Sequence, residues 1–416
     1  EEIQSAAFLF CDSLKVVTIE NGVKKISAYV FQDCSTLSSI IIPNTVTTIG
    51  EEAFCRCASL SSITLSDSLQ SIDRSTFYSC TSLTTITIPN SVTSIGAYAF
   101  RNCSSLTTIT IPNSVTNIGS RAFDGCSALT VPLYNANCFA YMPISYSGAY
   151  SIPEGIKQIA GGAFADCLDL TSITIPNSVN TIGSSAFIGC SSLTTITIPN
   201  GITSIEGNIF DSCSSLSSIT IGCNVTNIQN SAFINCPSLS SIVWNAKNCA
   251  DASRYNFAPF YYIQSQITSF TLGDSVKNIP AYLCYGMSKL TSMTIPHSVT
   301  KIGSDAFHGC TGLTSITSLA ETPPSCSDYT FWGVNKSIPI YVPCEKVTTY
   351  QATYGWDRFT NIQEPLLDYS IVIDVKDNHM GTAKVDFNTF CEGCQISATA
   401  NYGYHFVKWS DGTIDN

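Results

Sequence analysis

Apolar and polar residues follow one short pattern along most of the chain, and residues 83–106 show it clearly. Apolar residues alternate with threonines over residues 83–88, which predicts a short strand with one buried face. Pro89-Asn90 ends this strand as a turn. A second extended segment over residues 92–95 closes at Gly96. Apolar residues then recur at every third position, a spacing that predicts a tight 3₁₀-like or helical corner.

This pattern recurs with a period of 23 residues. Residues 81–103 and 104–126 are identical at 17 of 23 positions. A fixed period in this range predicts a solenoid, because each unit buries its apolar face only against its neighbours. We expect about fourteen coils, whose parallel strands stack over roughly 65 Å. One column of residues marks the period: Phe8, Phe31, Phe54, Phe77, Phe100 and Phe123, then Phe164, Phe187, Phe210 and Phe233, then Cys284 and Phe307.

The period divides the chain into three predicted parts. Residues 1–318 form the solenoid, which is interrupted near 131–158 and 245–275. Residues 319–364 lose the period and combine prolines, an apolar strand and buried-type aromatics, so we predict a cap over the last coil. Residues 365–416 read as short alternating strands separated by turns, which predicts a small β module that is truncated at its end.

Eleven of the twenty cysteines occupy one position of the repeat, three residues after the marker column. They could form a ladder of disulfides or a column of small buried thiols. Equivalent atoms of stacked coils lie nearly 5 Å apart, whereas a disulfide needs Cβ atoms about 3.5–4.5 Å apart, so we expect reduced thiols. Cys391 and Cys394 form a CxxC pair, for which a local disulfide or two free thiols are simpler than a redox or zinc site. The sequence leaves the states of Cys55, Cys391 and Cys394 open. The column comprises Cys11, Cys34, Cys57, Cys80, Cys103, Cys126, Cys167, Cys190, Cys213, Cys236 and Cys310.

Composition and charge narrow the functional classes. Charged residues make up 12% of the chain and the formal net charge is −11, without any basic run, which argues against binding to nucleic acid or anionic membranes. No apolar stretch approaches the ~20 residues of a membrane helix, so we expect no membrane insertion. The histidines stand outside known catalytic motifs. His297, His308 and Asp305 could share a metal, but polar substitution of the repeat surface is simpler. We therefore predict no enzyme, no metal and no cofactor.

The two interruptions hold the densest aromatic clusters and supply the candidate partner-binding residues. Loops on a rigid scaffold often carry binding, and tyrosine is frequent at interfaces. The same rings could instead plug the ends of interrupted coils, so both interpretations stay open. The threonine columns of the strands offer a second, polar face, for which a solvated sheet surface is the simpler explanation and a shallow polar binding face the alternative. The candidates are Tyr134, Phe139 and Tyr141 in the first interruption and Tyr255, Phe260, Tyr261 and Tyr262 in the second.

The motif LxxIxIPxxVxxIGxxAFxxCxxL, as it stands from Leu83 to Leu106, resembles the BspA-like (treponemal-type) leucine-rich repeat family of bacterial surface proteins. The resemblance covers roughly residues 1–318 and implies a curved, β-rich solenoid. The IYVP…Y…W…I run of residues 340–362 resembles the terminal cap of that family. At the end of the chain, GYxFxxWxDG (Gly403 to Gly412) resembles the B-repeat-type β modules of bacterial surface proteins.

The resemblance to the BspA-like family implies a noncatalytic protein that is secreted or displayed on a bacterial cell surface. Members are associated with adhesion to host matrix proteins and to other cells, so the expected partner is a protein. Two alternatives stay open: a structural spacer that positions an unseen C-terminal domain, and a glycan-binding module. In either case, the repeat column, including Phe54, Phe77, Phe100, Phe123, Cys57, Cys80, Cys103 and Cys126, is predicted to be structural.

Overall fold

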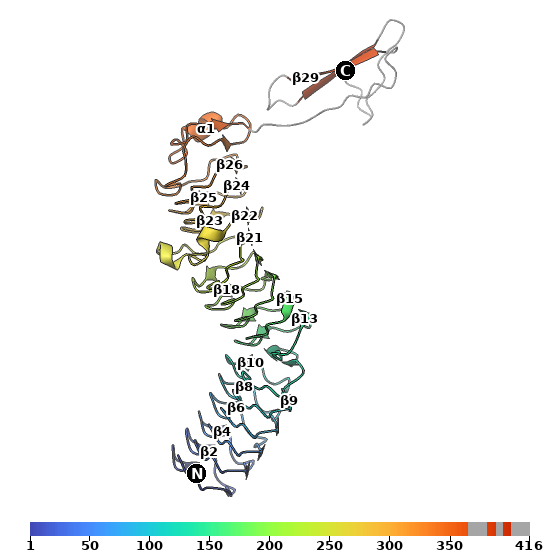
Figure 1. Cartoon of the computed structure of the whole chain (residues 1–416), viewed down its shortest axis with the longest axis vertical. Helices are drawn as coiled ribbons and strands as arrows, with labels where there is room; N and C mark the ends of the chain where they lie inside the picture. Colours follow the sequence, from blue (N-terminus) through green and yellow to red (C-terminus); the bar gives the residue numbers. More distant parts are fainter. Residues whose placement is uncertain (365–380, 388–393, 401–416) are drawn as a thin grey trace.

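A computed structural model describes residues 1–364, 381–387 and 394–400 of the 416-residue chain. Residues 1–364 form a curved β-solenoid of about 16 turns, and Figure 1 shows its coils stacked from the N-terminus to the region of α1. The count exceeds the fourteen expected from the sequence, partly because residues 319–364 continue the stack. There, two further strands pair in register beyond the last regular coil.

Most coils contribute a strand to a first wall and a strand, usually of two residues, to a second wall. The first wall comprises β3 (Ser39–Ile41), β5 (Ser62–Thr64), β7 (Thr85–Thr87), β9 (Thr108–Thr110), β13 (Gly148–Ser151), β15 (Leu170–Thr174), β17 (Thr195–Thr197), β19 (Ser218–Ile221), β21 (Ser241–Trp244), β22 (Ser269–Leu272), β24 (Ser292–Ile295), β26 (Ser315–Ser318), β27 (Ile340–Tyr341) and β28 (Ile362–Gln363).

The second wall comprises β1 (Glu2–Ile3), β2 (Lys25–Ile26), β4 (Thr48–Ile49), β6 (Ser71–Ile72), β8 (Ser94–Ile95), β10 (Asn117–Ile118), β12 (Cys138–Tyr141), β14 (Gln158–Ile159), β16 (Thr181–Ile182), β18 (Ser204–Ile205), β20 (Asn227–Ile228), β23 (Asn278–Ile279) and β25 (Lys301–Ile302). The remaining elements of the solenoid are β11 (Leu133–Tyr134), which forms a hairpin with β12, the 3₁₀ turns η1 (Tyr255–Phe257) and η2 (Gln264–Gln266), and the helix α1 (Val347–Gln351).

Neighbouring coils pair in parallel, and equivalent repeat positions face one another. Thr85 lies opposite Thr108, and Ile86 lies opposite Ile109. The isoleucine of β7 is buried while both of its threonines are exposed. This confirms the predicted strand with one buried face.

The corner that follows the second wall consists of consecutive turns. The N–H groups of Tyr98 and Phe100 donate to carbonyls of the next coil, at 3.0 and 2.8 Å, while the N–H of Arg101 closes a turn on the Tyr98 carbonyl. This alternation places Tyr98 and Asn102 in the left-handed region, with φ of 59° and 62°. The turns have the i→i+3 bonds of a 3₁₀ helix. They do not continue into a helix, because every second N–H donates to a carbonyl of the neighbouring coil instead.

Two columns of side chains fill the interior. The rings from Phe8 to Phe123 stack with centroids 5.2–5.6 Å apart, and the column resumes beyond the first interruption. Beside it, the thiol of Cys103 donates to the carbonyl of Phe77 in the preceding coil at 3.1 Å, and the same bond recurs in most coils. All eleven column cysteines are free, as predicted.

In several coils, the glycine that closes the second strand lies close to the backbone of the preceding coil. A Cβ on Gly119 would lie 2.3 Å from the backbone nitrogen of Ala97 and 2.7 Å from the carbonyl carbon of Gly96. Gly96 and Gly303 meet backbone atoms at similar distances. A side chain at Gly119 would therefore force these two coils to shift, whereas other coils accommodate Ser27, Asp73 or Gln229 at the same corner.

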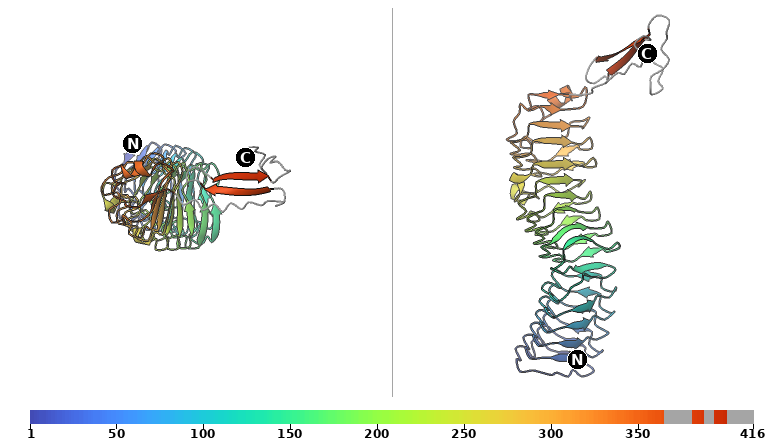
Figure 2. Two further views of the ribbon diagram at one scale, coloured as in Figure 1. Left: turned by 90° about the horizontal axis from the view of Figure 1, so that it is seen from above. Right: turned by 45° about the vertical axis from the view of Figure 1, so that its right-hand side comes forward.

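The stack changes direction at the first interruption (Figures 1 and 2). The first-wall strands on either side of it, β9 and β13, pair with β7 and β15 and not with each other. On the second wall, the side chain of Gln158 bridges the interruption by bonding to the backbone of Ile118. Its amide oxygen accepts from the N–H of Ile118 at 3.1 Å, and its nitrogen donates to the Ile118 carbonyl at 3.1 Å.

Residues 319–364 cover the last coil with buried aromatics. Tyr350 donates to the carbonyl of Ala320 at 2.7 Å, and the indole nitrogen of Trp356 donates to the carbonyl of Pro324 at 2.9 Å. Farther along, β29 (Gly381–Phe387) and β30 (Cys394–Ala400) form an antiparallel pair. The rest of the predicted β module, including the CxxC side chains and the GYxFxxWxDG motif, lies outside the described residues, so its boundaries remain predictions.

Candidate partner-binding surface

The second interruption is a coil of the solenoid with extra residues. Phe260 lies 27 residues after Phe233 instead of 23, yet its ring stacks on Phe233 at 5.4 Å and continues the column. Trp244, at the end of β21, is fully buried and packs against Phe260 and Phe270. The extra residues form η1 and η2, which therefore project from a well-packed core.

η1 carries Tyr255, and Tyr261 and Tyr262 lie between η1 and η2. Tyr255 lies 5.8 Å from Tyr261 and stacks on Tyr285 at 5.5 Å between ring centroids. Tyr285 in turn lies 4.8 Å from the imidazole of His308. We call the connected rings the aromatic surface: Tyr255, Tyr261, Tyr262, Tyr282, Tyr285 and His308.

Most of this surface is at least partly open to solvent. Tyr255 is 48% exposed and Tyr262 is 51% exposed, whereas the other four side chains are half-buried. Burial, together with the nearby Asp305 carboxylate, raises the pKa of Tyr282. The surface presents aromatic rings with polar tips, a composition that is enriched at protein interfaces.

A carboxylate orients the imidazole at one end of the aromatic surface. Asp305 lies 2.8 Å from Nδ1 of His308, and its other oxygen accepts from the Ser304 hydroxyl at 2.6 Å. Because this hydroxyl bonds the carboxylate and not the imidazole, the three residues do not form a nucleophile–base arrangement. Within the described residues, no group of three or more His, Cys, Asp or Glu side chains could hold a metal ion.

The candidates of the first interruption lie mostly in the core. Phe139 is fully buried and stacks on Phe164 at 4.7 Å, and Tyr141 is 4% exposed. Only Tyr134, stacked on Phe139 at 5.9 Å, presents a substantially exposed ring. Phe260 is likewise buried, so Phe139, Tyr141 and Phe260 pack the stack and are left out of the aromatic surface. The eight column residues named from the sequence also lie in the core.

The family model described as the BspA type leucine rich repeat region (6 copies) matches the chain in three segments, residues 1–130, 134–259 and 256–363. These matches cover most of the chain. The chain belongs to the BspA-type leucine-rich repeat family.

Two solved structures of leucine-rich repeat proteins share this fold. A protein of Bacteroides ovatus is 26% identical over 84% of this chain and 90% of its own, with a TM-score of 0.51. One of Eubacterium ventriosum is 24% identical over 77% and 87%, also with a TM-score of 0.51. The T. pallidum leucine-rich repeat protein is 31% identical over 43% and 77%, with a TM-score of 0.33. No curated protein matches the chain.

Half of the aromatic surface of this BspA-type chain was not anticipated from the sequence. Tyr261, Tyr285 and His308 each directly follow the column residue of their coil, and Trp332 does so in the coil after them. Trp332 packs 6.0 Å from Tyr329, and both are 56% exposed, so they extend the aromatic character toward the end of the stack. An alignment of the coils on the column would have revealed this signal.

Proposed function

We propose that this chain is a noncatalytic binding protein, secreted or displayed on a bacterial cell surface, that holds a protein partner against the aromatic surface. One observation carries the proposal: six rings from three successive coils touch one another on the outside of a rigid stack. Tyrosine anchors of this kind contribute much of the affinity at interfaces, and a preformed surface avoids the entropic cost of ordering loops.

The free thiols are compatible with an oxidising location. Burial raises the pKa of the Cys103 thiol to about 12 and that of Cys167 to about 12, so neither forms the thiolate that starts oxidation near neutral pH. In the part of the chain that the structure describes, no helix is long and apolar enough to cross a membrane.

A double variant tests the proposed surface. Tyr255→Ser with Tyr285→Ser removes the central stacked pair, and Phe10→Ser with Tyr29→Ser is the matched control, because these two rings are exposed at the other end of the stack. Purified proteins are assayed against immobilised fibronectin, fibrinogen and whole cells. We expect saturable binding that weakens about tenfold or more in the first variant and is unchanged in the control.

Thermal melting of both variants separates binding from folding. An equal loss of binding and of melting temperature would assign the tyrosines to packing. Saturable binding that both variants retain would place the partner on another face.

A spacer is the second candidate function. The N-terminus and the α1 region lie at opposite ends of the rod (Figure 1), which is the geometry needed to hold an attached domain away from a surface. Deleting one regular coil, residues 81–103, would distinguish the two functions. A spacer responds to the loss of length, whereas a binding protein keeps its affinity.

A further inference from the structure

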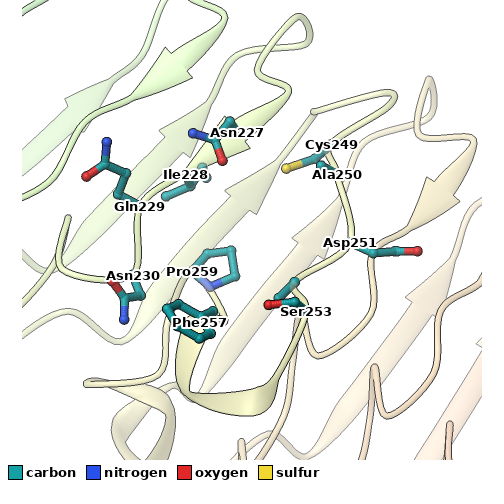
Figure 3. A pocket seen from close by; sticks show the side chains of 11 residues that line it. Asn227, Ile228, Gln229, Asn230, Cys249, Ala250, Asp251, Ser253, Phe257 and Pro259 are labelled. Carbon is teal, nitrogen blue, oxygen red and sulfur yellow. The ribbon is translucent and has the colours of Figure 1, made fainter.

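We propose that a hollow beside the second interruption binds one residue of a neutral saccharide. The hollow has a volume of about 420 Å³, within the range of small-molecule sites. It forms where residues 249–253 run past β20 before the chain enters η1 (Figure 3). It does not use the rings of the aromatic surface, so it does not depend on the function proposed above.

One side of the hollow is apolar. Phe257 and Pro259 lie beside each other, as Figure 3 shows, and Ile228 and Cys249 complete the apolar lining. Phe257 is 51% exposed, and its ring is absent from the stacked column. An exposed ring at the edge of a hollow offers a flat apolar face, which matches the C–H face of a pyranose.

The other side carries uncharged hydrogen-bonding groups. Asn230 donates its amide N–H to the carbonyl of Asn256 at 2.8 Å, which leaves the amide oxygen as an acceptor. Asn227 donates to Ser204 at 3.4 Å and turns its oxygen toward the hollow (Figure 3). Ser253 adds a hydroxyl across from them. This rim is rich in acceptors, so it suits a ligand that brings several O–H donors.

Charge favours a neutral ligand over an ion. No lysine or arginine lines the hollow, so nothing there would neutralise a phosphate or carboxylate. Asp251 is the one lining carboxylate, but it accepts from the N–H of Ala281 at 2.7 Å, lies 3.7 Å from Lys301 and points away from the hollow (Figure 3). With a single ring and no free carboxylate, the site also lacks the aromatic cage that ammonium ligands need. A sugar residue complements both sides of the hollow, because its C–H face matches the apolar side and its hydroxyl groups match the acceptors on the other side.

Saturation-transfer NMR on the full chain tests the proposal with glucose, galactose, mannose and N-acetylglucosamine at millimolar concentration. Choline and glucose 6-phosphate are the charged probes. We expect transfer to the ring protons of at least one neutral sugar, and binding about tenfold weaker in Phe257→Ala. Phe10→Ala is the matched control, because Phe10 is an exposed phenylalanine at the other end of the stack.

Each outcome bears on the proposal. Absence of transfer from all four neutral sugars, preferential binding of choline or of the phosphate, or equal binding by Phe257→Ala and the unchanged chain would overturn it. If Phe257→Ala melts early, Asn227→Ala takes its place, since Asn227 is an exposed side chain on the opposite rim. Loss of sugar binding with intact binding to matrix proteins would separate this site from the aromatic surface.

Discussion

Replacing Cys103 with alanine should make the stability of the solenoid less sensitive to alkaline pH. The thiol is fully buried and donates to the carbonyl of Phe77, and burial raises its pKa from 9.0 to about 12. In the unfolded chain the thiol loses its proton near pH 9, while in the folded chain it keeps the proton to about pH 12. Between these values the folded state binds more protons, so the free energy of unfolding falls as pH rises.

The two opposing effects of the substitution can be compared. Each pH unit above 9 removes about 1.4 kcal/mol of stability through one such thiol. Below pH 9 the alanine variant should be less stable by about 1–2 kcal/mol, because it loses the S–H···O bond and leaves a small cavity. The stability curves of the two proteins should therefore meet near pH 10, and above that pH the alanine variant should be the more stable protein.

Urea unfolding followed by circular dichroism, with a reductant present, measures both curves between about pH 7.5 and 10.5. Val92→Ala is the control, because Val92 is an equally buried, non-titrating residue of the same region. We expect its curve to run parallel to that of the unchanged chain. Because a repeat array can unfold in segments, the comparison uses the transition of the segment that contains the substitution. Parallel curves for Cys103→Ala and the unchanged chain would refute the reasoning.

Three further predictions follow from the core. Gly119→Ala should destabilise its segment by about 3 kcal/mol or more in urea unfolding, because its Cβ meets backbone atoms at 2.3–2.8 Å; a cost below 1 kcal/mol would show that the coils can separate. Phe100→Ala should cost about 4 kcal/mol and Phe8→Ala less, since Phe100 stacks on two rings and Phe8 on one; equal losses would contradict nearest-neighbour stability. Iodoacetamide followed by mass spectrometry should label two half-buried thiols first, and early labelling of the buried column would contradict the packing. Among the cysteines that the structure describes, these two are Cys11 and Cys223, whereas the half-buried Cys326 should react slowly because burial raises the pKa of its thiol to about 12.

The repeat itself could be predicted because burial in each coil depends on residues 23 positions away. The alternation at residues 83–88 predicted the strand of β7, and the spacing of Phe77, Phe100 and Phe123 predicted the stacked column. In a solenoid these local patterns also determine the tertiary contacts, since every coil packs against a near copy of itself.

Three other features could not be predicted from the sequence, each for a physical reason. Phe139 and Phe260 were candidates for binding, with packing left open as the alternative, because the interruptions change the chain length between columns; in the structure their rings return to the stack. The left-handed backbone at Tyr98 has no glycine to signal it, because bonds to the next coil impose it. Tyr285 and His308 are 23 residues apart, so their contact becomes visible only when the coils are superimposed.

The end-to-end arrangement of the coils has a mechanical consequence. A force applied between the N-terminus and the α1 region (Figure 2) acts along the stacking direction, so it pulls on the hydrogen bonds of one coil boundary at a time. Each detached coil of 23 residues would release roughly 75 Å of chain, far more than the ~4.8 Å that it occupied in the stack. Under tension the rod would therefore lengthen in discrete steps, and each step would dissipate mechanical work. An attached molecule would then experience a lower peak force.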